Sequence, residues 1–284
     1  MSATVLSGRE LAAAIRAGAA AQAAELAEAG TPPKLAVVVA TADESSAWYV
    51  RSIAGAAEKA GIACDIVDLG TGASPDDIRH RLAALSADES VHGVILQTPL
   101  PDGAKLEDLA SAIAFEKDVD GANPLSLGRL ASGLPAFAPA TAEAVVAILD
   151  HHGVELTGRH VAVVGRSTVV GKPAAHLLLN RNATVTVCHS RTGDLAAVTS
   201  AADVVVAAVG RAGLITAEHV RAGAVVVDVG TNPTEDGGLV GDVDAASVTG
   251  KAGALTPVPG GVGPVTTALL LRHTVEAASA ALDR

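Results

Sequence analysis

Short apolar runs alternate with longer amphipathic segments along the first part of the chain. The runs have the length of strands and contain few charges, whereas the segments between them place apolar residues three or four positions apart, as helices do. Buried parallel strands joined by crossover helices give this alternation. The pattern predicts strands over 35–41, 63–69 and 91–97, with helices near 45–60, 75–87 and 105–114.

A second alternating series follows a passage rich in Pro, Gly and Ser at 120–141, so we predict a domain boundary near residue 140. The expected elements are a helix near 141–153, strands over 160–165, 183–189, 202–210 and 223–230, and a helix over 265–282. We therefore predict an α/β protein of two domains. The first takes residues 1–140 and the C-terminal helix at about 265–284, and the second is a Rossmann-like parallel sheet over 141–264.

Composition and charge narrow the partners to small molecules. Hydrophobic residues make up 49% of the chain and the mean hydropathy is +0.40, which is ample for buried cores, but no apolar run approaches the roughly 20 residues of a membrane-spanning helix. A net charge of −11 argues against nonspecific binding to nucleic acid or an anionic membrane. Charged residues interrupt the N-terminal segment, as a secretory signal would not allow, so a cytoplasmic location is expected. Cys64 and Cys188 have no metal-binding spacing, and no metal site is expected.

A glycine-containing turn in the second series is the first candidate for chemistry. In VAVVGRSTVVGKPAAHLLL an apolar strand ends at Gly165 and a helix begins near Gly171. Glycine at such a turn lets backbone N–H groups approach a phosphate, whose negative charge the helix dipole favours. The spacing is not G-x-G-x-x-G, so an ordinary tight turn between strand and helix is the alternative to a dinucleotide site.

The end of the next strand indicates which dinucleotide would bind. In TVTVCHSRT the residues Ser190 and Arg191 stand where an NAD-binding fold usually places an acidic residue for the ribose 2′-hydroxyl. A hydroxyl and a guanidinium suit a 2′-phosphate, which a carboxylate would repel. This pair predicts NADP as the cofactor, and a solvated arginine at the end of a loop is the alternative.

Eight ordered blocks cover almost the whole chain, and their order and spacing resemble one enzyme family. They are YVRS, GVILQTPLP, KDVDGANPLSLGRL, VVGRSTVVGKPAAHLLLNRNATVTVCHSRT, ADVVVAAVG, VVVDVGTN, GDVD and TPVPGGVGPVTTALLL. Together they resemble the bifunctional methylenetetrahydrofolate dehydrogenase/methenyltetrahydrofolate cyclohydrolase family. The resemblance implies that the second domain binds NADP, that folate binds to the first domain and the cleft between the domains, and that the protein is a homodimer. It also implies cofactor contacts at Gly165, Arg166, Ser167, Ser190 and Thr231.

The resemblance also assigns roles around the folate. Tyr49 matches a tyrosine that stacks on the folate ring system, and the chain has no other tyrosine. Gln97 matches an active-site glutamine, and Asp120 matches the aspartate that accepts hydrogen bonds from the amino and N–H groups of the pterin. Pro259 and Gly260 lie in the TPVPGG block and are expected to contact the substrate.

One position departs from the family at the expected folate site. Relatives carry a lysine four residues after the tyrosine, whereas this chain has Ile53. The segments ATADES at 40–45 and PATAEA at 139–144 also differ from the family pattern. Hydride transfer needs no protein base, but the hydrolysis of the methenyl compound needs proton transfer that isoleucine cannot provide. Weak or lost cyclohydrolase activity is therefore expected.

The expected function is the NADP-dependent oxidation of 5,10-methylenetetrahydrofolate to 5,10-methenyltetrahydrofolate. Two alternatives stay open from the sequence. One is a paralogue that acts on a modified folate or another one-carbon carrier, and the other is an inactive relative that binds NADP or folate.

Overall fold

The chain folds into two compact units, each assembled from two stretches of sequence. The structure is a computed structural model and describes residues 2–234 and 236–282. Unit 1 comprises Met1–Ala12 and Thr141–Thr266, and unit 2 comprises Ala13–Ala140 and Thr267–Arg284. The predicted class, a two-domain α/β protein with a parallel sheet in its second domain, is confirmed.

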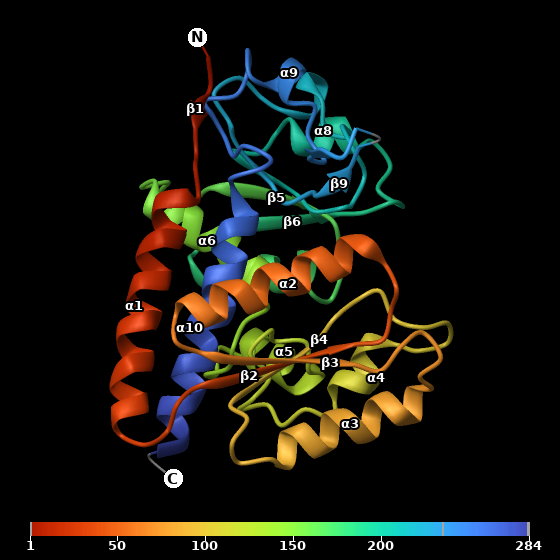
Figure 1. The fold of residues 1–284 in the computed structure, drawn as a ribbon. Helices are drawn as coiled ribbons and strands as arrows, with labels where there is room; N and C mark the ends of the chain where they lie inside the picture. The colour runs from red at the N-terminus through yellow and green to blue at the C-terminus, as the bar shows by residue number, and fades with distance from the viewer. Residues whose placement is uncertain (1, 235, 283–284) are drawn as a thin grey trace. The chain divides into compact units, whose positions relative to one another are not determined.

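Unit 1 is built on a six-stranded sheet in the order β1-β11-β8-β7-β5-β6, and every pair of neighbouring strands is parallel. Figure 1 shows helices and loops around these strands. The strands are β1 (Thr4–Val5), β5 (His160–Val164), β6 (Thr184–Cys188), β7 (Val204–Ala207), β8 (Val225–Asp228) and β11 (Ala254–Leu255). The helices are α6 (Ala140–His151), α7 (Gly171–Asn180), α8 (Leu195–Thr199), η1 (Ala217–His219) and α9 (Ala245–Val248). A small hairpin joins β9 (Asn232–Pro233) to β10 (Leu239–Val240).

The central strands of this sheet are apolar on both faces, as a sheet covered by helices requires. Both β7 and the last four residues of β5 are fully buried. One core cluster joins Val164, Val205 and Val226 from neighbouring strands to Val220 and Val248 from the connecting segments. Burial of this apolar surface is the main source of stability for the unit.

The first strand belongs to unit 1, whereas the sequence pattern had grouped residues 1–140 together. Thr4 and Val5 pair in parallel with Ala254 and Leu255 of β11. The Ala3 N–H also donates to the carbonyl of Thr249 at 3.0 Å. These backbone bonds explain why the first twelve residues group with 141–266.

Unit 2 has a three-stranded parallel sheet in the order β3-β2-β4. The strands are β2 (Lys34–Val39), β3 (Ala63–Asp68) and β4 (Gly93–Leu96). The helices are α2 (Glu44–Lys59), α3 (Pro75–Ala87), α4 (Leu106–Ala110) and α5 (Pro124–Ala131). Two long helices, α1 (Arg9–Glu28) and α10 (Val262–Leu282), begin in residues of unit 1 and continue into unit 2 (Figure 1).

Sequence signals at the helix starts explain where two of these helices begin. The Asp43 carboxylate accepts a hydrogen bond from the Ser46 N–H at 2.8 Å and caps α2. Ser74 and Asp77 form a capping box at the start of α3, with Pro75 at the first helical position. Within residues 2–234 and 236–282, no helix has the length and apolar character needed to cross a membrane.

Candidate active site

The predicted cofactor residues of unit 1 lie at the carboxyl edge of the parallel sheet. Gly165 follows β5, Ser190 and Arg191 follow β6, and Thr231 follows β8. β5 lies between β6 and β7 in the sheet, although β6 and β7 both follow it in the sequence. Such a reversal of strand order opens a crevice at the carboxyl ends of the strands, where α/β proteins bind their ligands.

The turn from β5 to α7 requires glycine at both of its ends. Gly165 has a φ of +131°, and a Cβ on it would lie 2.1 Å from the carbonyl oxygen of Ala208. A Cβ on Gly171 would lie 2.2 Å from the carbonyl oxygen of Gly165. The backbone is therefore packed too closely for side chains, and the helix α7 begins directly above the strand end. This is the arrangement that presents a helix N-terminus to a phosphate.

Two other predicted residues of this turn are exposed. Arg166 and Ser167 both face solvent. The Ser167 hydroxyl accepts hydrogen bonds from the N–H groups of Val170 at 3.1 Å and Gly171 at 3.3 Å, so it helps to order the start of α7. A cation and a hydroxyl at this place fit the phosphates of a dinucleotide.

The loop after β6 is held in a defined turn that leaves its polar side chains outside. The His189 N–H donates to the Thr192 hydroxyl at 2.8 Å, and the Arg191 N–H donates to His189 Nδ1 at 3.1 Å. Ser190 and Arg191 are exposed. A fixed backbone with an exposed hydroxyl and guanidinium fits a ribose 2′-phosphate, which needs charge-assisted donors.

Buried carboxylates order two further loops at the same edge, and the sequence analysis did not identify them. Asp242, which is fully buried, accepts hydrogen bonds from the backbone N–H groups of Val209, Gly210 and Arg211 at 2.6–2.9 Å. It also accepts one from the Asn232 amide at 3.0 Å. This carboxylate therefore ties the loop after β7 to the segment that follows Thr231.

The Asp228 carboxylate ties the end of β8 to the segment around Asp242. It accepts hydrogen bonds from the N–H groups of Gly230, Asp242 and Val243 at 2.9–3.0 Å. Burial raises the pKa of Asp228 to about 6, although these hydrogen bonds act in the opposite direction. The neighbouring Gly241 leaves no room for a side chain, because a Cβ there would overlap the Asp228 carboxylate. The signal in the sequence was a glycine within two residues of each aspartate, Gly230 in VVVDVG and Gly241 in GDVD.

Pro259 and Gly260 lie in the loop between β11 and α10. The Gly260 carbonyl accepts a hydrogen bond from the Gly8 N–H at 3.0 Å, and Gly260 has a φ of +108°. A Cβ on Gly260 would lie 3.1 Å from Nε of Arg9. Arg9, whose guanidinium lies beside this loop, was not among the residues expected at the site. Pro259 is exposed and Gly260 is buried.

In unit 2, Tyr49 lies in the second turn of α2. Its side chain is half-buried, and its hydroxyl is hydrogen-bonded to the side chain of Thr267 in α10. Burial raises the pKa of Tyr49, and the charge of Asp120 raises it further. The phenol is therefore a neutral hydrogen-bonding group near a carboxylate.

Asp120 lies in a loop that a second carboxylate holds in place. Asp118 is fully buried, and it accepts hydrogen bonds from the N–H groups of Ala122 and Asn123, both at 2.9 Å, and from the Ser126 hydroxyl at 2.6 Å. Asp120 itself is half-buried and accepts a hydrogen bond from the Ala140 N–H.

The environment of Asp120 favours its protonated form. Burial and then the charge of Asp118 raise the pKa of Asp120 to about 7, while His273 and the Ala140 N–H act in the opposite direction. A carboxyl group with a pKa near neutrality at a polar, half-buried position is a frequent property of functional sites.

Gln97 follows β4 directly. Its Nε2 donates to the carbonyl of Thr98 at 2.6 Å, and the Ser46 hydroxyl donates to the same carbonyl at 3.0 Å. Ser46 lies one turn before Tyr49 in α2. The end of β4 is therefore linked to the first turn of the helix that carries Tyr49, and the Gln97 side chain is half-buried there.

Ile53 has 0% of its surface exposed, and it shares the buried face of α2 with Ser46, Val50 and Ala57. It lies one helical turn after Tyr49, so the two side chains are neighbours on the helix. Trp48, by contrast, is 62% exposed. The structure therefore places an apolar, water-excluded group at position 53.

The candidate residues fall into two groups, one in each unit. Unit 2 brings Tyr49, Asp120 and Thr267 together from α2, a loop and α10. Unit 1 holds the expected cofactor residues together with Pro259 and Gly260. Among residues 2–234 and 236–282, no cluster of three or more His, Cys, Asp or Glu could hold a metal ion.

Unit 1 has a parallel sheet, a turn with Gly165 and Gly171 after β5, and a loop with Arg191 after β6. These features define a dinucleotide-binding α/β protein. Comparison with known proteins agrees. Residues 139–282 match the family model of the tetrahydrofolate dehydrogenase/cyclohydrolase NAD(P)-binding domain, and residues 6–120 match that of the family's catalytic domain. The chain belongs to the tetrahydrofolate dehydrogenase/cyclohydrolase family.

Individual relatives support this membership over the full chain. The bifunctional protein FolD 1 of Saccharopolyspora erythraea is 69% identical over 274 residues, which cover 96% of this chain and 94% of the relative. The bifunctional enzyme FolD of Campylobacter jejuni has a similar structure, with a TM-score of 0.94 and 38% identity over 98% of this chain and 99% of that chain. The dehydrogenase-cyclohydrolase of Trypanosoma brucei, complexed with NADP cofactor and inhibitor, has a TM-score of 0.94 and 36% identity over 100% of both chains.

Proposed function

We propose that the protein oxidises 5,10-methylenetetrahydrofolate to 5,10-methenyltetrahydrofolate with NADP. The observation that carries this proposal is the cluster of Tyr49, Asp120 and Thr267, which places a neutral aromatic ring beside a carboxyl group in the domain that matches the family's catalytic domain. The comparisons do not favour a modified one-carbon carrier or an inactive relative, since full-length relatives are named bifunctional FolD proteins.

Each residue of the cluster has a defined part in this function. NADP, when bound, accepts the hydride that leaves the methylene carbon, and the nitrogen lone pairs of the folate stabilise the resulting amidinium cation. Tyr49 offers a flat ring for stacking on the pterin. Asp120 in its carboxylate form accepts hydrogen bonds from two adjacent donors of the pterin and orients it. Positioning of this kind can supply most of the acceleration of a hydride transfer.

The second activity of the family is proposed to be weak or lost. Water must attack the amidinium carbon and lose a proton before a ring nitrogen can leave. Ile53 occupies the position of the family's lysine, is fully buried and has no group that could transfer a proton. No such group is required for the hydride transfer, so the two activities separate at this position.

The test of this proposal follows the two products separately. Purified protein is mixed with 5,10-methylenetetrahydrofolate and NADP, and NADPH and the methenyl compound are quantified separately after chromatography. We expect equal amounts of both in the initial phase. Failure to form NADPH with this folate, at micromolar enzyme and saturating NADP, would refute the proposed dehydrogenase.

Preference for NADP over NAD is proposed to depend on Arg191. Because the guanidinium can make charge-assisted hydrogen bonds to the 2′-phosphate, Arg191→Ala should weaken NADP binding about ten- to a hundredfold and change NAD binding little. Dissociation constants from calorimetry with both cofactors measure this. Arg79→Ala is the matched control, because it removes the same charge from an exposed position of α3 in unit 2. Equal affinity of the unmutated protein for NADP and NAD would contradict the assignment.

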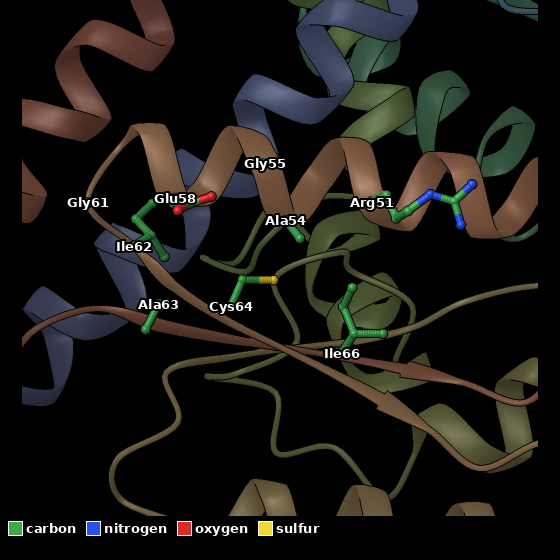
Figure 2. Close-up of a pocket in the computed structure, with 9 residues that line it drawn as sticks. All are labelled: Arg51, Ala54, Gly55, Glu58, Gly61, Ile62, Ala63, Cys64 and Ile66. Atoms are coloured by element: carbon green, nitrogen blue, oxygen red, sulfur yellow. The ribbon is translucent and has the colours of Figure 1, made fainter.

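The protein is proposed to form a homodimer through α2 and the edge strand β3. A cavity of about 550 Å³ lies between these elements, with Arg51 and Glu58 projecting from α2 and Cys64 and Ile66 from β3 (Figure 2). β3 is at the edge of its sheet, and Ile66 is 46% exposed. Unpaired strand edges with apolar side chains favour pairing with another chain.

Charge also favours a second copy of this chain as the partner. Arg51 and Glu58 lie two helical turns apart on one face of α2, and both are exposed. In a two-fold interface each surface meets itself in the opposite direction, so Arg51 would face Glu58 of the partner subunit twice. The surface is therefore complementary to its own copy.

Charge reversal tests this interface. Arg51→Glu or Glu58→Arg alone should raise the dimer dissociation constant about tenfold or more, because each creates two like-charge contacts. The double variant Arg51→Glu/Glu58→Arg should restore dimerisation. Sedimentation equilibrium gives the constants. A monomeric unmutated protein at micromolar concentration, or no rescue in the double variant, would refute this interface.

A cytoplasmic location is also proposed. Cys64 and Cys188 are both free thiols, and such thiols persist in a reducing compartment.

A further inference from the structure

His273 connects α10 to the loop that carries Asp120. It is 2% exposed, and its Nδ1–H donates to the carbonyl of Val119 at 2.7 Å. The ring of Phe137 packs against it with a centroid separation of 5.0 Å and a tilt of 33°. Val119 lies directly between Asp118 and Asp120, so the imidazole is fixed next to both carboxyl groups.

The same histidine, when protonated, acts on both carboxyl groups. Burial raises the pKa of Asp118 and of Asp120, and the charge of His273 lowers both. The groups that act on Asp120 come from four elements. They are Asp118 in its own loop, Tyr49 in α2, the Ala140 N–H at the start of α6 and His273 in α10. The next residue along α10, Arg272, pairs with Glu276 at 3.3 Å.

The two carboxyl groups have different tasks. Asp118 accepts three hydrogen bonds that order its own loop, as described above, and it is closed to solvent. Asp120 is half-buried and is the group available to a ligand. A like charge at Asp118 disfavours ionisation of Asp120, and a cation beside the pair would offset this effect.

We propose that His273 is a positioning residue that holds the Asp120 loop through Val119 and places a protonatable imidazole beside the segment that carries Asp118 and Asp120, where its protonated form favours folate binding by the Asp120 carboxylate. This inference rests on the proposed role of Asp120 in binding the pterin. It predicts that folate binding depends on a side chain in α10 that does not itself contact the folate.

His273→Asn separates the charge of His273 from its hydrogen bond. The asparagine amide can donate to the Val119 carbonyl as Nδ1–H does, but it cannot carry a charge. The pKa of Asp120 should therefore rise by about one unit or more, as expected when a nearby opposite charge is removed. The measurement is carbon-13 NMR of the carboxyl groups of the whole protein, with the Asp120 signal identified by its loss in Asp120→Asn.

Steady-state kinetics give a second measurement on the same variant. In the pH profile of kcat/KM for the folate, the fall on the acid side should move to higher pH by the same amount. At any pH well below the pKa of Asp120, kcat/KM should therefore be about tenfold lower than in the unmutated protein. The KM for NADP and the kcat at high pH should change little. His152→Gln is the matched control, because it removes another partly buried histidine that is hydrogen-bonded to a backbone carbonyl, that of Ser7 in unit 1.

The outcomes distinguish this inference from the proposed function. An unchanged Asp120 titration in folded His273→Asn would overturn the role of His273. A shifted titration, with a folate KM that does not respond to Asp120→Ala, would support the coupling and refute the role of Asp120 in folate binding.

The unmutated protein provides a test that does not depend on how the variant folds. When two ionisable groups interact strongly, each titration step of the pair changes the NMR signals of both groups. The Asp120 carboxyl signal and the His273 ring signal should therefore both show two inflections, at the same two pH values. Independent single-step titrations would overturn the coupling.

Discussion

Incubated with 5,10-methylenetetrahydrofolate and NADP, the protein is expected to accumulate the methenyl product, which then decays no faster than in buffer alone. The reason is the buried isoleucine at position 53, since general acid or base assistance is worth about 10²- to 10⁴-fold in reactions of this kind. Absorbance of the methenyl compound, added alone and followed with and without enzyme, measures the decay. Enzyme-dependent hydrolysis as fast as NADPH formation would show that another group performs the proton transfer.

Ile53→Lys tests the same position in the opposite direction. The lysine would be largely desolvated, which lowers its pKa and favours proton transfer near neutrality. We expect methenyl hydrolysis to rise at least about tenfold above the buffer rate, but below the full 10²- to 10⁴-fold, because the segments 40–45 and 139–144 are also expected to differ from the family pattern. The variant should be less stable, since it buries an amine.

Ile53→Met is the matched control for this substitution. Methionine has a similar length and fills the buried site without a titratable group. It should retain dehydrogenase activity and gain no hydrolysis. Hydrolysis in Ile53→Met equal to that in Ile53→Lys would show that a change of shape, and not the amine, restores the activity.

Asp120→Ala is expected to raise the folate KM about a hundredfold and leave the NADP dissociation constant unchanged. In the proposed binding mode the pterin loses hydrogen bonds to a charged group, each worth about 1.5–3 kcal/mol, and NADP makes none of them. Initial rates at varied folate, together with calorimetry of NADP binding, measure the two effects. Loss of NADP binding with retained folate binding would reverse the assignment of the two sites.

The pH dependence of the unmutated enzyme should follow from the same residue. Only the carboxylate form accepts two hydrogen bonds, so kcat/KM for the folate should fall as the pH falls through about 7, the pKa of Asp120 in the folded protein. The effect on stability has the opposite direction. A folded pKa above the ordinary value of an aspartate gives a contribution to stability that is present at low pH and is lost as the pH rises through about 7.

Asp120→Asn should therefore be more stable than the unmutated protein at pH 8, by about 1–2 kcal/mol, and nearly equal to it at pH 4. Thermal unfolding at the two pH values measures this difference. A binding group that lowers stability until its ligand is present is common at functional sites.

Periodicity predicted the longer strands of both sheets and several helices, because their residues repeat the strand or helix pattern over enough positions. The long helix α1, Arg9–Glu28, was not predicted. The helix 75–87 was predicted with its observed bounds. The helix α5 was not predicted, since its segment is dense in Pro, Gly and Ser. Its start signals, Asn123 as the cap and Pro124 at the first helical position, are nonetheless present in the sequence. The two-residue strands β1 and β11 could not be predicted, because their pairing joins positions about 250 residues apart.

The candidate site divides in a similar way. Exposed residues after predicted strands, such as Ser190 and Arg191, could be proposed from their position at a strand end, and their roles stay predictions. His273 could not be proposed, because it lies in a helix rich in Ala and Leu whose pattern indicates only packing. Its relation to Asp120 depends on a contact between residues 154 positions apart. Buried carboxylates such as Asp242 are missed for the same reason, because a sequence does not show which N–H groups will converge on them.

The continuity of α10 has a consequence for any attempt to divide this protein. A fragment that ends at residue 140 would contain Tyr49 and Val119 but neither Thr267 nor His273, to which they are hydrogen-bonded. The complementary fragment would keep β11 but lose β1, the strand that covers its edge. We therefore expect neither fragment to fold as an autonomous module. A recombination event at the apparent linker would separate residues that complete each other, so the two halves are expected to be inherited together.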